Sequence, residues 1–449
     1  MTDNNERDPE EEFRDMLRGF LEGREGIDPS KLAGAAGLPT DPDAISRMMA
    51  QLQAAMNASG SEGINWTMAM EQAKSIALKS VIPVTAIARA EIDQAFHVSA
   101  LWLAEACDLS DTAESPQLLT RMEWIEQTFP LWQQLAEPVA LNISEAMTTV
   151  LNDQAPEEMK GIIAGASNMM RQVGGTLFAM QLGQVLGQLS TEVVSGGDVG
   201  IPVLDTGRAA LLPQNMAEFG EGLDIPMDQV HLYLAVRETA YARLFRHAKW
   251  LRLNFLAGVT EFARGISINQ DRLEEIANNF DPANPEELRD AIGAGALIPP
   301  KTPEQQAALD RLENQLALIE GWVDVVTTAA TTRLPRVDAI AETVRRRRAS
   351  GGPAESALAS LVGLELRPRR LRDAVKMWQS VTDAVGIEAR DALWDHPDVV
   401  PTSEDLDNPA GLIARLESAA RGETPAPDDM DKALEELLDG KDFGPPPEN

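Results

Sequence analysis

The pentapeptide R-E-T-A-Y places Arg237, Glu238 and Tyr241 inside a stretch that has the periodicity of one long helix. With His at its first and fifth positions it would read H-E-x-x-H. In that motif two imidazoles bind Zn²⁺ from one helical face, and the glutamate activates the bound water. Arginine stays protonated and has no lone pair to offer, and tyrosine could ligate only as the phenolate, with an ordinary pKa of about 10. The spacing is therefore that of a zinc helix, but two residue types are chemically wrong for the metal.

Glu261 is the second acidic residue of interest. It lies twenty residues beyond Tyr241, where one group of zinc sites takes its third ligand from a glutamate on the next helix. A buried carboxylate that has lost its cation would destabilise the fold by several kcal/mol. We therefore predict that Arg237 replaces the metal ion by forking to Glu261 or Glu238, and that Tyr241 fills the volume of the second imidazole.

The histidines of the chain could in principle restore a zinc site. His231 and His247 lie six residues outside the two ends of the pentapeptide, so on an unbroken helix they face elsewhere. His396 lies in a predicted turn, and His97 lies far away in the sequence. A structural role is the expectation for each. A zinc ion held by Glu238, Glu261 and a remote histidine, with His247 as the nearest candidate, stays open as the alternative.

Long helical patterns surround this motif, since Ala, Leu and Met carry most of the apolar content and favour helix. The helix that carries R-E-T-A-Y is expected over 227–264, with a break near 252–256. The segment 199–213 has Ile, Val and Leu between Gly and Pro, which predicts a short hairpin or edge strand. The other helices are expected near 65–82, 86–108, 116–151, 157–194, 270–279, 285–294, 303–333, 335–349, 354–364, 367–385 and 403–419.

These patterns predict a mainly α-helical fold with a single large body, a small β element and flexible acidic termini. We divide the chain into an N-terminal region over 1–62, a helical domain over 63–402 and an acidic C-terminal tail over 403–449. Gly183 and Gly187, four residues apart, predict a core helix that approaches a neighbour closely. The arginine run 345–348 is expected to pair with acidic helices, and an anionic ligand or partner stays open as the alternative.

The composition excludes several classes of function. The formal net charge of −32 and the pI of about 4.5 disfavour a nucleic-acid partner, because a phosphate backbone would be repelled. Cys107 is the one cysteine, which excludes a disulfide framework and a Cys-rich zinc site. We find neither a signal peptide nor an apolar run long enough for a membrane span, and we expect a cytoplasmic protein.

Several longer motifs identify the chain as resembling a family of actinobacterial zincin-like proteins, labelled zinc-dependent metalloproteases or hydrolases. A related branch is labelled as associated with deazaflavin-coenzyme biosynthesis. The resemblance covers about 64–402 and implies a zincin-like body with an acid at Glu238, a metal-ligating His where Tyr241 stands, and a ligand at Glu261. The motifs are ALLPQNMAEFGEGL, HLYLAVRETAYARLFRHAKWLRLNFLAGVTEFARGI, LALIEGWVDVV, VRRRRASGGPAESALASLVGLELRPRRLRDA and IEARDALWDHPDVVPT.

Three functions follow from these observations. The first is a non-catalytic protein on a zincin-like scaffold that acts by binding. The second is a hydrolase in which Glu238 is the general base and Arg237 or Tyr241 stabilises an oxyanion. The third is an assembly or adaptor protein with a protein partner, working through amphipathic terminal helices. Those helices would carry the apolar residues Phe13, Met16, Leu17, Phe20 and Leu21 and, at the other end, Met430, Leu434, Leu437 and Leu438.

Overall fold

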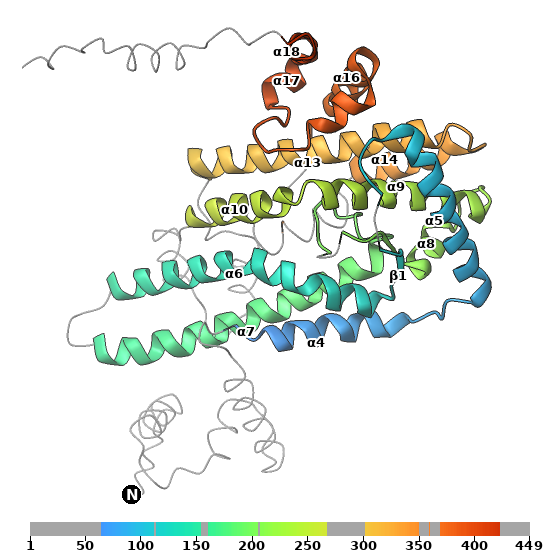
Figure 1. The fold of residues 1–449 in the computed structure, drawn as a ribbon. Helices are drawn as coiled ribbons and strands as arrows, with labels where there is room; N and C mark the ends of the chain where they lie inside the picture. Colours follow the sequence, from blue (N-terminus) through green and yellow to red (C-terminus); the bar gives the residue numbers. More distant parts are fainter. Residues whose placement is uncertain are drawn as a thin grey trace, which may run out of the picture.

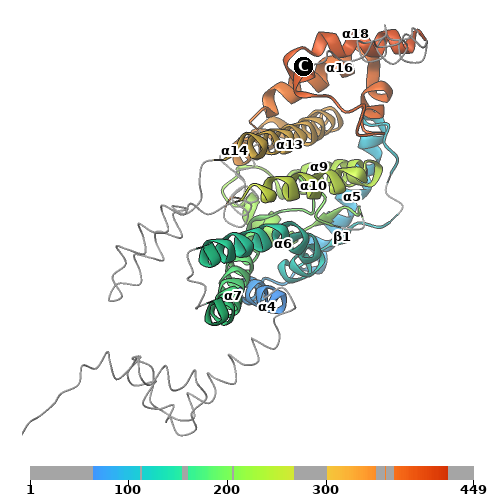
Figure 2. The same ribbon diagram turned by 90° about the vertical axis from the view of Figure 1, so that its left-hand side faces the viewer.

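Long helices stack in successive layers through the molecule (Figure 1). The computed structural model describes residues 64–111, 114–153, 160–204, 207–266, 301–349, 359 and 369–422. From one end of the stack to the other, α16 packs on α13, α13 on α10, α10 on α6, and α6 on α7 (Figures 1 and 2). The expectation of a mainly α-helical fold is confirmed.

The described elements follow the predicted order closely. The predicted helices over 270–279, 285–294 and 354–364 and both terminal amphipathic helices lie outside the described residues, apart from residue 359. No described helix is long and apolar enough to cross a bilayer. The elements are α4 (Trp66–Ala77), η1 (Leu78–Ser80), α5 (Ala86–Ala106), β1 (Gln117–Leu118), α6 (Arg121–Asp153), α7 (Lys160–Glu192), β2 (Ala210–Leu211), α8 (Pro213–Gly220), α9 (Met227–His247), α10 (Trp250–Arg264), α13 (Pro303–Ala330), α14 (Val337–Ala349), α16 (Leu371–Ala392), α17 (Ser403–Asp407) and α18 (Pro409–Ala420).

The two glycines of α7 allow α4 to lie directly against it. A Cβ atom on Gly183 would lie 2.5 Å from the backbone oxygen of Ala69, and one on Gly187 would lie 2.7 Å from Cβ of Ile76. On the α4 side the nearest atoms are backbone oxygens of the fully buried Ala69 and Ala73 and side-chain atoms of Gln72 and Ile76. The prediction of a core helix with close approach at these glycines is confirmed.

The helix of the R-E-T-A-Y motif ends earlier than the sequence suggests. α9 ends at His247 and α10 begins at Trp250, so the break lies at Ala248 rather than near 252–256. Neither Gly nor Pro marks this position. A tertiary contact accompanies the break instead, because the indole of Trp250 donates a hydrogen bond to the backbone oxygen of Trp394 and stacks on its ring.

The small β element pairs with a distant part of the chain. β2 lies inside the expected segment but runs parallel to β1, with Gln117 opposite Ala210 and Leu118 opposite Leu211. Ser195 forms an antiparallel bridge with Leu211 on the other side. The hairpin alternative was therefore wrong, and β2 is a short strand between the distant strand β1 and the nearby segment at Ser195.

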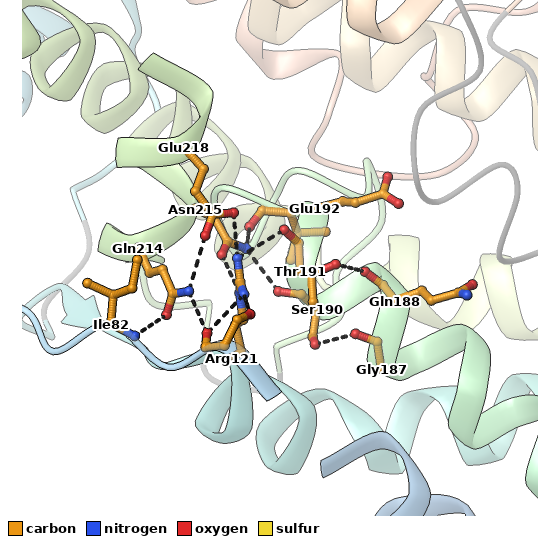
Figure 3. A network of polar contacts seen from close by, with 12 residues as sticks. Ile82, Arg121, Gly187, Gln188, Ser190, Thr191, Glu192, Gln214, Asn215 and Glu218 are labelled. Atoms are coloured by element: carbon orange, nitrogen blue, oxygen red, sulfur yellow. Dashed lines mark hydrogen bonds and ion pairs between the residues drawn. The ribbon is translucent and has the colours of Figure 1, made fainter. Parts of the chain in front are cut away.

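A buried arginine fixes the C-terminal end of α7, from which a glycine-rich loop over 195–200 follows (Figure 3). Arg121 Nε donates to Asn215 Oδ1 at 2.7 Å, and Nη2 donates to Glu218 at 2.6 Å. The amide of Asn215 then donates to the backbone oxygens of Ser190 and Val193. Helix ends leave their last carbonyls without partners, and these bonds satisfy two of them and set where the loop begins.

Candidate functional site

α9 buries the residues of the R-E-T-A-Y motif in the centre of the molecule. Arg237 and Tyr241, one helical turn apart, point the same way. Nη2 of Arg237 donates to the phenol oxygen of Tyr241 at 3.0 Å, and the guanidinium lies 5.2 Å from the centre of the ring. The two positions at which a zinc helix would carry imidazoles therefore converge on one point.

The carboxylate at that point is Glu320, which α13 supplies. One oxygen accepts a hydrogen bond from Arg237 Nη2 at 2.7 Å, and the other accepts one from the Tyr241 hydroxyl at 2.6 Å. Glu320 is only 2% exposed. A charge buried this deeply is stable only with a partner of opposite sign and satisfied hydrogen bonds, and Glu320 has both.

Arg348, from α14, completes what we call the Arg–Tyr–Glu cluster: Arg237, Tyr241, Glu320 and Arg348. Its Nη2 lies 2.8 Å from Glu320 Oε1 and 3.3 Å from the Tyr241 hydroxyl. Glu320 thus faces two guanidinium groups and one phenol. Each of these three groups can donate hydrogen bonds, and both guanidiniums carry a fixed positive charge.

Asp198, in the loop over 195–200, lies against the same arginines. Its carboxylate accepts a hydrogen bond from the amide of Val194 and lies 3.1 Å from Nη2 of Arg347 and 3.7 Å from Nη2 of Arg348. Arg347 also donates to the backbone oxygen of Glu192 at the end of α7. α14 therefore connects the cluster to the end of α7.

The protonation states in the cluster follow from burial and charge. Burial raises the pKa of the Tyr241 phenol above its ordinary value of 10, although Arg237 opposes the change. Burial disfavours the charge of Arg237, but Tyr241 and Glu320 outweigh it, and the pKa of Arg237 is raised. Burial likewise disfavours the charge of Asp198, but Arg347 and Arg348 dominate and lower its pKa. Tyr241 is therefore a neutral phenol beside permanent cations.

Glu238 points away from the cluster, and its carboxylate accepts hydrogen bonds from backbone amides. Its two carboxylate oxygens accept hydrogen bonds from the amides of Gly197 and Ala210, each at 2.8 Å, and the Ser195 side chain provides another. Burial, at 2% exposure, raises the pKa of Glu238 to about 7, although these three hydrogen bonds oppose the change. Glu238 thus ties the loop over 195–200 and strand β2 to helix α9.

Glu261 does not reach the motif. It lies on α10, is about half exposed, and pairs with Arg311 on α13 at 2.6 Å. The prediction that Arg237 forks to Glu261 or Glu238 was therefore wrong in its partner, which is Glu320. The physical reason is the break at Ala248, which gives α10 its own direction.

Each of the four histidines has its own contacts, apart from those of Glu238 and Glu320. His247 contacts Asp395 at 2.7 Å, and His396 lies 3.2 Å from Asp398. Nδ1 of His97 contacts the backbone oxygen of Asp93 in its own helix. His231 is buried 3.8 Å from Glu91, and burial lowers its pKa. None of these contacts brings a histidine to Glu238 or Glu320.

The arginine run pairs with carboxylates along its whole length. Arg345 makes a two-pronged contact with Asp324 on α13, and Arg346 pairs with Glu342 on the exposed face of its own helix. The other two arginines reach Asp198 and Glu320, as described above. The expectation that the run pairs with acidic groups is confirmed.

Sequence reasoning missed Glu320 and Asp198. Glu320 and Asp324 interrupt the apolar stretch LALIEGWVDVV, one helical turn apart. Charged residues are rarely buried without a partner, so this pattern and the arginines one turn apart at 345 and 348 were the available signal. Asp198 lies in the sequence SGGDVG, which carries no comparable signal.

Zinc, which the motif spacing implies, does not fit the residues present. Two of the four side chains in the cluster are guanidiniums without a lone pair, and the third is a neutral phenol. Both oxygens of Glu320 already accept hydrogen bonds from them. Among the described residues, no three His, Cys, Asp or Glu side chains lie close enough to hold a metal ion.

Two of the cavities lined by described residues lie beside α9. One, of about 10 Å³, adjoins the cluster and is lined by Arg237, Arg347, Arg348 and Asp198 together with Val194, Ser195, Phe219, Leu234 and Val344. The other, of about 450 Å³, is lined by Thr239, the residue after Glu238, by Phe96 and His97 of α5, and by acids that include Asp93 and Glu114. Small-molecule pockets span about 300–1,000 Å³, so only the second cavity has that size.

Comparisons with known proteins show the family and the fold of the chain. The model of a family described as zincin-like metallopeptidase matches residues 64–413, and the chain belongs to this family. A solved protein from Chloroflexus aurantiacus, described as a hydrolase candidate with a novel fold, shares the fold at 20% identity and a TM-score of 0.55. The match covers 79% of this chain and 99% of that one. No curated protein sequence matches the chain.

Proposed function

We propose that this chain is a non-catalytic member of the zincin-like family in which an ion-pair network has replaced the metal centre, and that it acts by binding. The observation that carries the proposal is the triple contact of Glu320 with Arg237, Tyr241 and Arg348. A divalent ion needs electron-pair donors at positions 237 and 241. Here those positions hold a permanent cation and a neutral phenol.

The hydrolase alternative finds less support. A general base must reach the proton that it abstracts, yet both oxygens of Glu238 are bound to the amides of Gly197 and Ala210. The raised pKa of Glu238 is the one property that favours catalysis, and burial accounts for it. The cavity beside the cluster, about 10 Å³, is far smaller than a substrate pocket.

A binding role has support of its own in the larger cavity. It has the volume of a small-ligand pocket, with buried Phe96 and Thr239 on its lining and exposed Asp93 and His97. Thr239 neighbours Glu238 in the sequence, and Ala209 of the same cavity neighbours Ala210. An occupant there would contact the two segments that Glu238 holds together.

The test is to rebuild the zinc site. The double variant Arg237→His/Tyr241→His restores both imidazoles, and Glu320 is then placed to be the third ligand. We expect the double variant, but not the wild type, to bind one zinc ion per chain in competition with a chromogenic chelator. Adding Glu320→Gln should abolish the gain, whereas adding Glu261→Gln, the matched control, should leave it intact.

The proposal fails if the wild type itself binds zinc at one ion per chain in this assay. The identity of the third ligand is decided separately. Zinc binding by the double variant that is lost with Glu261→Gln and kept with Glu320→Gln would overturn the role given to Glu320. Wild-type hydrolysis of any substrate that disappears in Glu238→Gln would instead establish the hydrolase alternative.

A further inference from the structure

The larger cavity brings together four segments that lie far apart in the chain. α5 forms one wall, and α9 contributes Thr239. The segments that precede β1 and β2 complete the described lining, with Pro116 and Ala209 among their residues. The volume of about 450 Å³ is that of a pocket for a small organic molecule, and the chemistry of the lining indicates which kind of molecule would fit.

Asp93 is the carboxylate of this cavity that the protein leaves without a partner. Two other carboxylates on the lining are already paired: Asp111 lies 3.3 Å from Arg243, and Glu114 lies 2.8 Å from Arg208. The exposed side chain of Asp93 makes no hydrogen bond or ion pair with any described residue, since only its backbone oxygen is in contact. No Lys or Arg stands among the described residues of the lining. Asp93 is therefore free to pair with a cation that enters from outside.

His97 and Thr239 also leave the hydrogen-bond donors to the ligand. Nδ1 of His97 lies 2.8 Å from the backbone oxygen of Asp93. Because a carbonyl oxygen can only accept, Nδ1 carries the proton, and Nε2 of the neutral ring has a lone pair. The hydroxyl of Thr239 donates to the backbone oxygen of Ala235 at 2.7 Å, so its proton is used within α9. The acceptors at Asp93 and His97 thus call for a ligand that donates.

The rest of the lining that we use is apolar. Phe96 and Ala209 are buried at 5% and 1% exposure, and Ala100 is half-buried beside them. Apolar surface of this kind favours a hydrocarbon body, because its removal from water is favourable. The formal net charge of −32 attracts cations to the protein and repels carboxylates and phosphates. A cation with an apolar body meets both conditions.

We propose that this cavity binds a small primary amine, with its ammonium group on Asp93 and its apolar body against Phe96 and Ala209. The proposal rests on the binding role given above and names the class of ligand. It predicts a specific order of affinity: an amine binds more tightly than a neutral molecule of the same shape, and a carboxylate of similar shape binds least, because it would face Asp93.

Ligand-observed NMR titration of the full chain tests this order with 2-phenylethylamine, 2-phenylethanol and 3-phenylpropionate. We expect a Kd for the amine on the order of 0.1–1 mM, as for other ligands of this size. Asp93→Asn should weaken binding of the amine by about tenfold, the effect of losing one hydrogen bond to a charged group, and should leave the alcohol unchanged. The matched control is Glu91→Gln, since Glu91 is an exposed carboxylate of α5 outside the lining. It should bind the amine like the wild type.

A second pair of variants locates the site. Ala100→Phe places a ring in the cavity and should abolish binding of both the amine and the alcohol. Ala104→Phe, one turn further along α5, places the same ring on exposed surface outside the lining and should not. Thermal unfolding checks that both variants fold.

The proposal is overturned if the amine does not bind, or binds no more tightly than the alcohol. It is also overturned if binding of the amine is unchanged in Asp93→Asn or in Ala100→Phe. None of these results bears on the zinc content of the wild type. The amine site and the metal-free cluster can therefore fail separately.

Discussion

Two buried arginine–carboxylate networks lie along α13, and they differ in how completely they are satisfied. In the first, Arg390 and Asp391 form a two-pronged pair at 2.7 and 2.9 Å, with both residues about 1% exposed. The indole of Trp322 and the amide of Asp108 donate to the same carboxylate. In the second, Glu320 faces two arginines and a tyrosine beside a small cavity and an unsatisfied Nε.

The two networks differ in charge balance and in the number of donors that reach each carboxylate. The Arg390–Asp391 pair has one charge of each sign, and four donors reach the two oxygens of Asp391. The Arg–Tyr–Glu cluster has the convergent geometry of a metal site, but its charges do not balance within it. We interpret the second network as the remnant of a cation site whose ion has been replaced by guanidinium groups.

The largest effect should come from breaking the balanced pair. Asp391→Ala leaves Arg390 buried without a counter-charge, which should lower the free energy of unfolding by about 3–5 kcal/mol. Denaturant unfolding measures the loss. The double variant Arg390→Met/Asp391→Leu, which removes both charges, should recover much of it. Equal losses in the single and double variants would show that the charges themselves are not what the site needs.

Glu238 should make the free energy of unfolding depend on pH. Its pKa is about 7 in the folded chain against an ordinary 4.5, so the native state holds the proton more tightly. Its contribution is fully present below about pH 4.5 and is lost as pH rises through about 7, a change of about 3 kcal/mol. Relative to Glu238→Gln, the wild type should therefore lose about that amount of unfolding free energy as the pH rises across this window.

The matched control for this prediction is Glu261→Gln, whose curve should run parallel to that of the wild type. If the curve of Glu238→Gln is also parallel to that of the wild type, then the pKa of Glu238 is not raised. In that case the hydrogen bonds from Gly197 and Ala210 stabilise the charged carboxylate.

Arg237→Met should have a smaller effect than Asp391→Ala, because Arg348 remains to face Glu320. We expect a loss of about 1–3 kcal/mol, the range for removing one partner of a buried hydrogen-bonded group. In the Arg237→Met background, Arg348→Met should lower the free energy of unfolding by more than it does in the wild type, since Glu320 would have lost both cations. Strict additivity of the two changes would argue that the arginines do not share one carboxylate.

The smallest effect should come from Glu261, the position that sequence spacing favoured. Both Glu261 and Arg311 are about half exposed, and surface pairs of this kind contribute about 0.2–1 kcal/mol. Glu261→Gln should therefore lie within that range in denaturant unfolding. A loss comparable to that of Asp391→Ala would show that Glu261 has a buried role that the structure does not assign to it.

The fold was largely predictable because its signals are local. Apolar periodicity gave most helix limits within a few residues of those observed, although α8 was not predicted and α16 ends at Ala392 rather than at 385. The close approach at Gly183 and Gly187 followed from residue size alone. The β pairing was not predictable, because the partner of β2 lies about ninety residues earlier, and two-residue strands carry no pattern of their own.

The site was predictable only on α9. Arg237, Glu238 and Tyr241 could be selected because the motif fixes their spacing on one helix. The partner of Arg237 depends on the break at Ala248 and on the packing of α13 and α14, and neither has a sequence signal next to the motif. Spacing along the chain therefore favoured Glu261, whereas the tertiary arrangement supplied Glu320.

The central claim is that protonated side chains occupy the place of a divalent cation. The most direct test is the zinc content of the purified full-length wild type, expressed in zinc-supplemented medium and measured by elemental mass spectrometry after dialysis against a weak chelator. The account predicts zinc far below one ion per chain, with no change in Glu320→Gln. One zinc ion per chain that is lost in Glu320→Gln would contradict it.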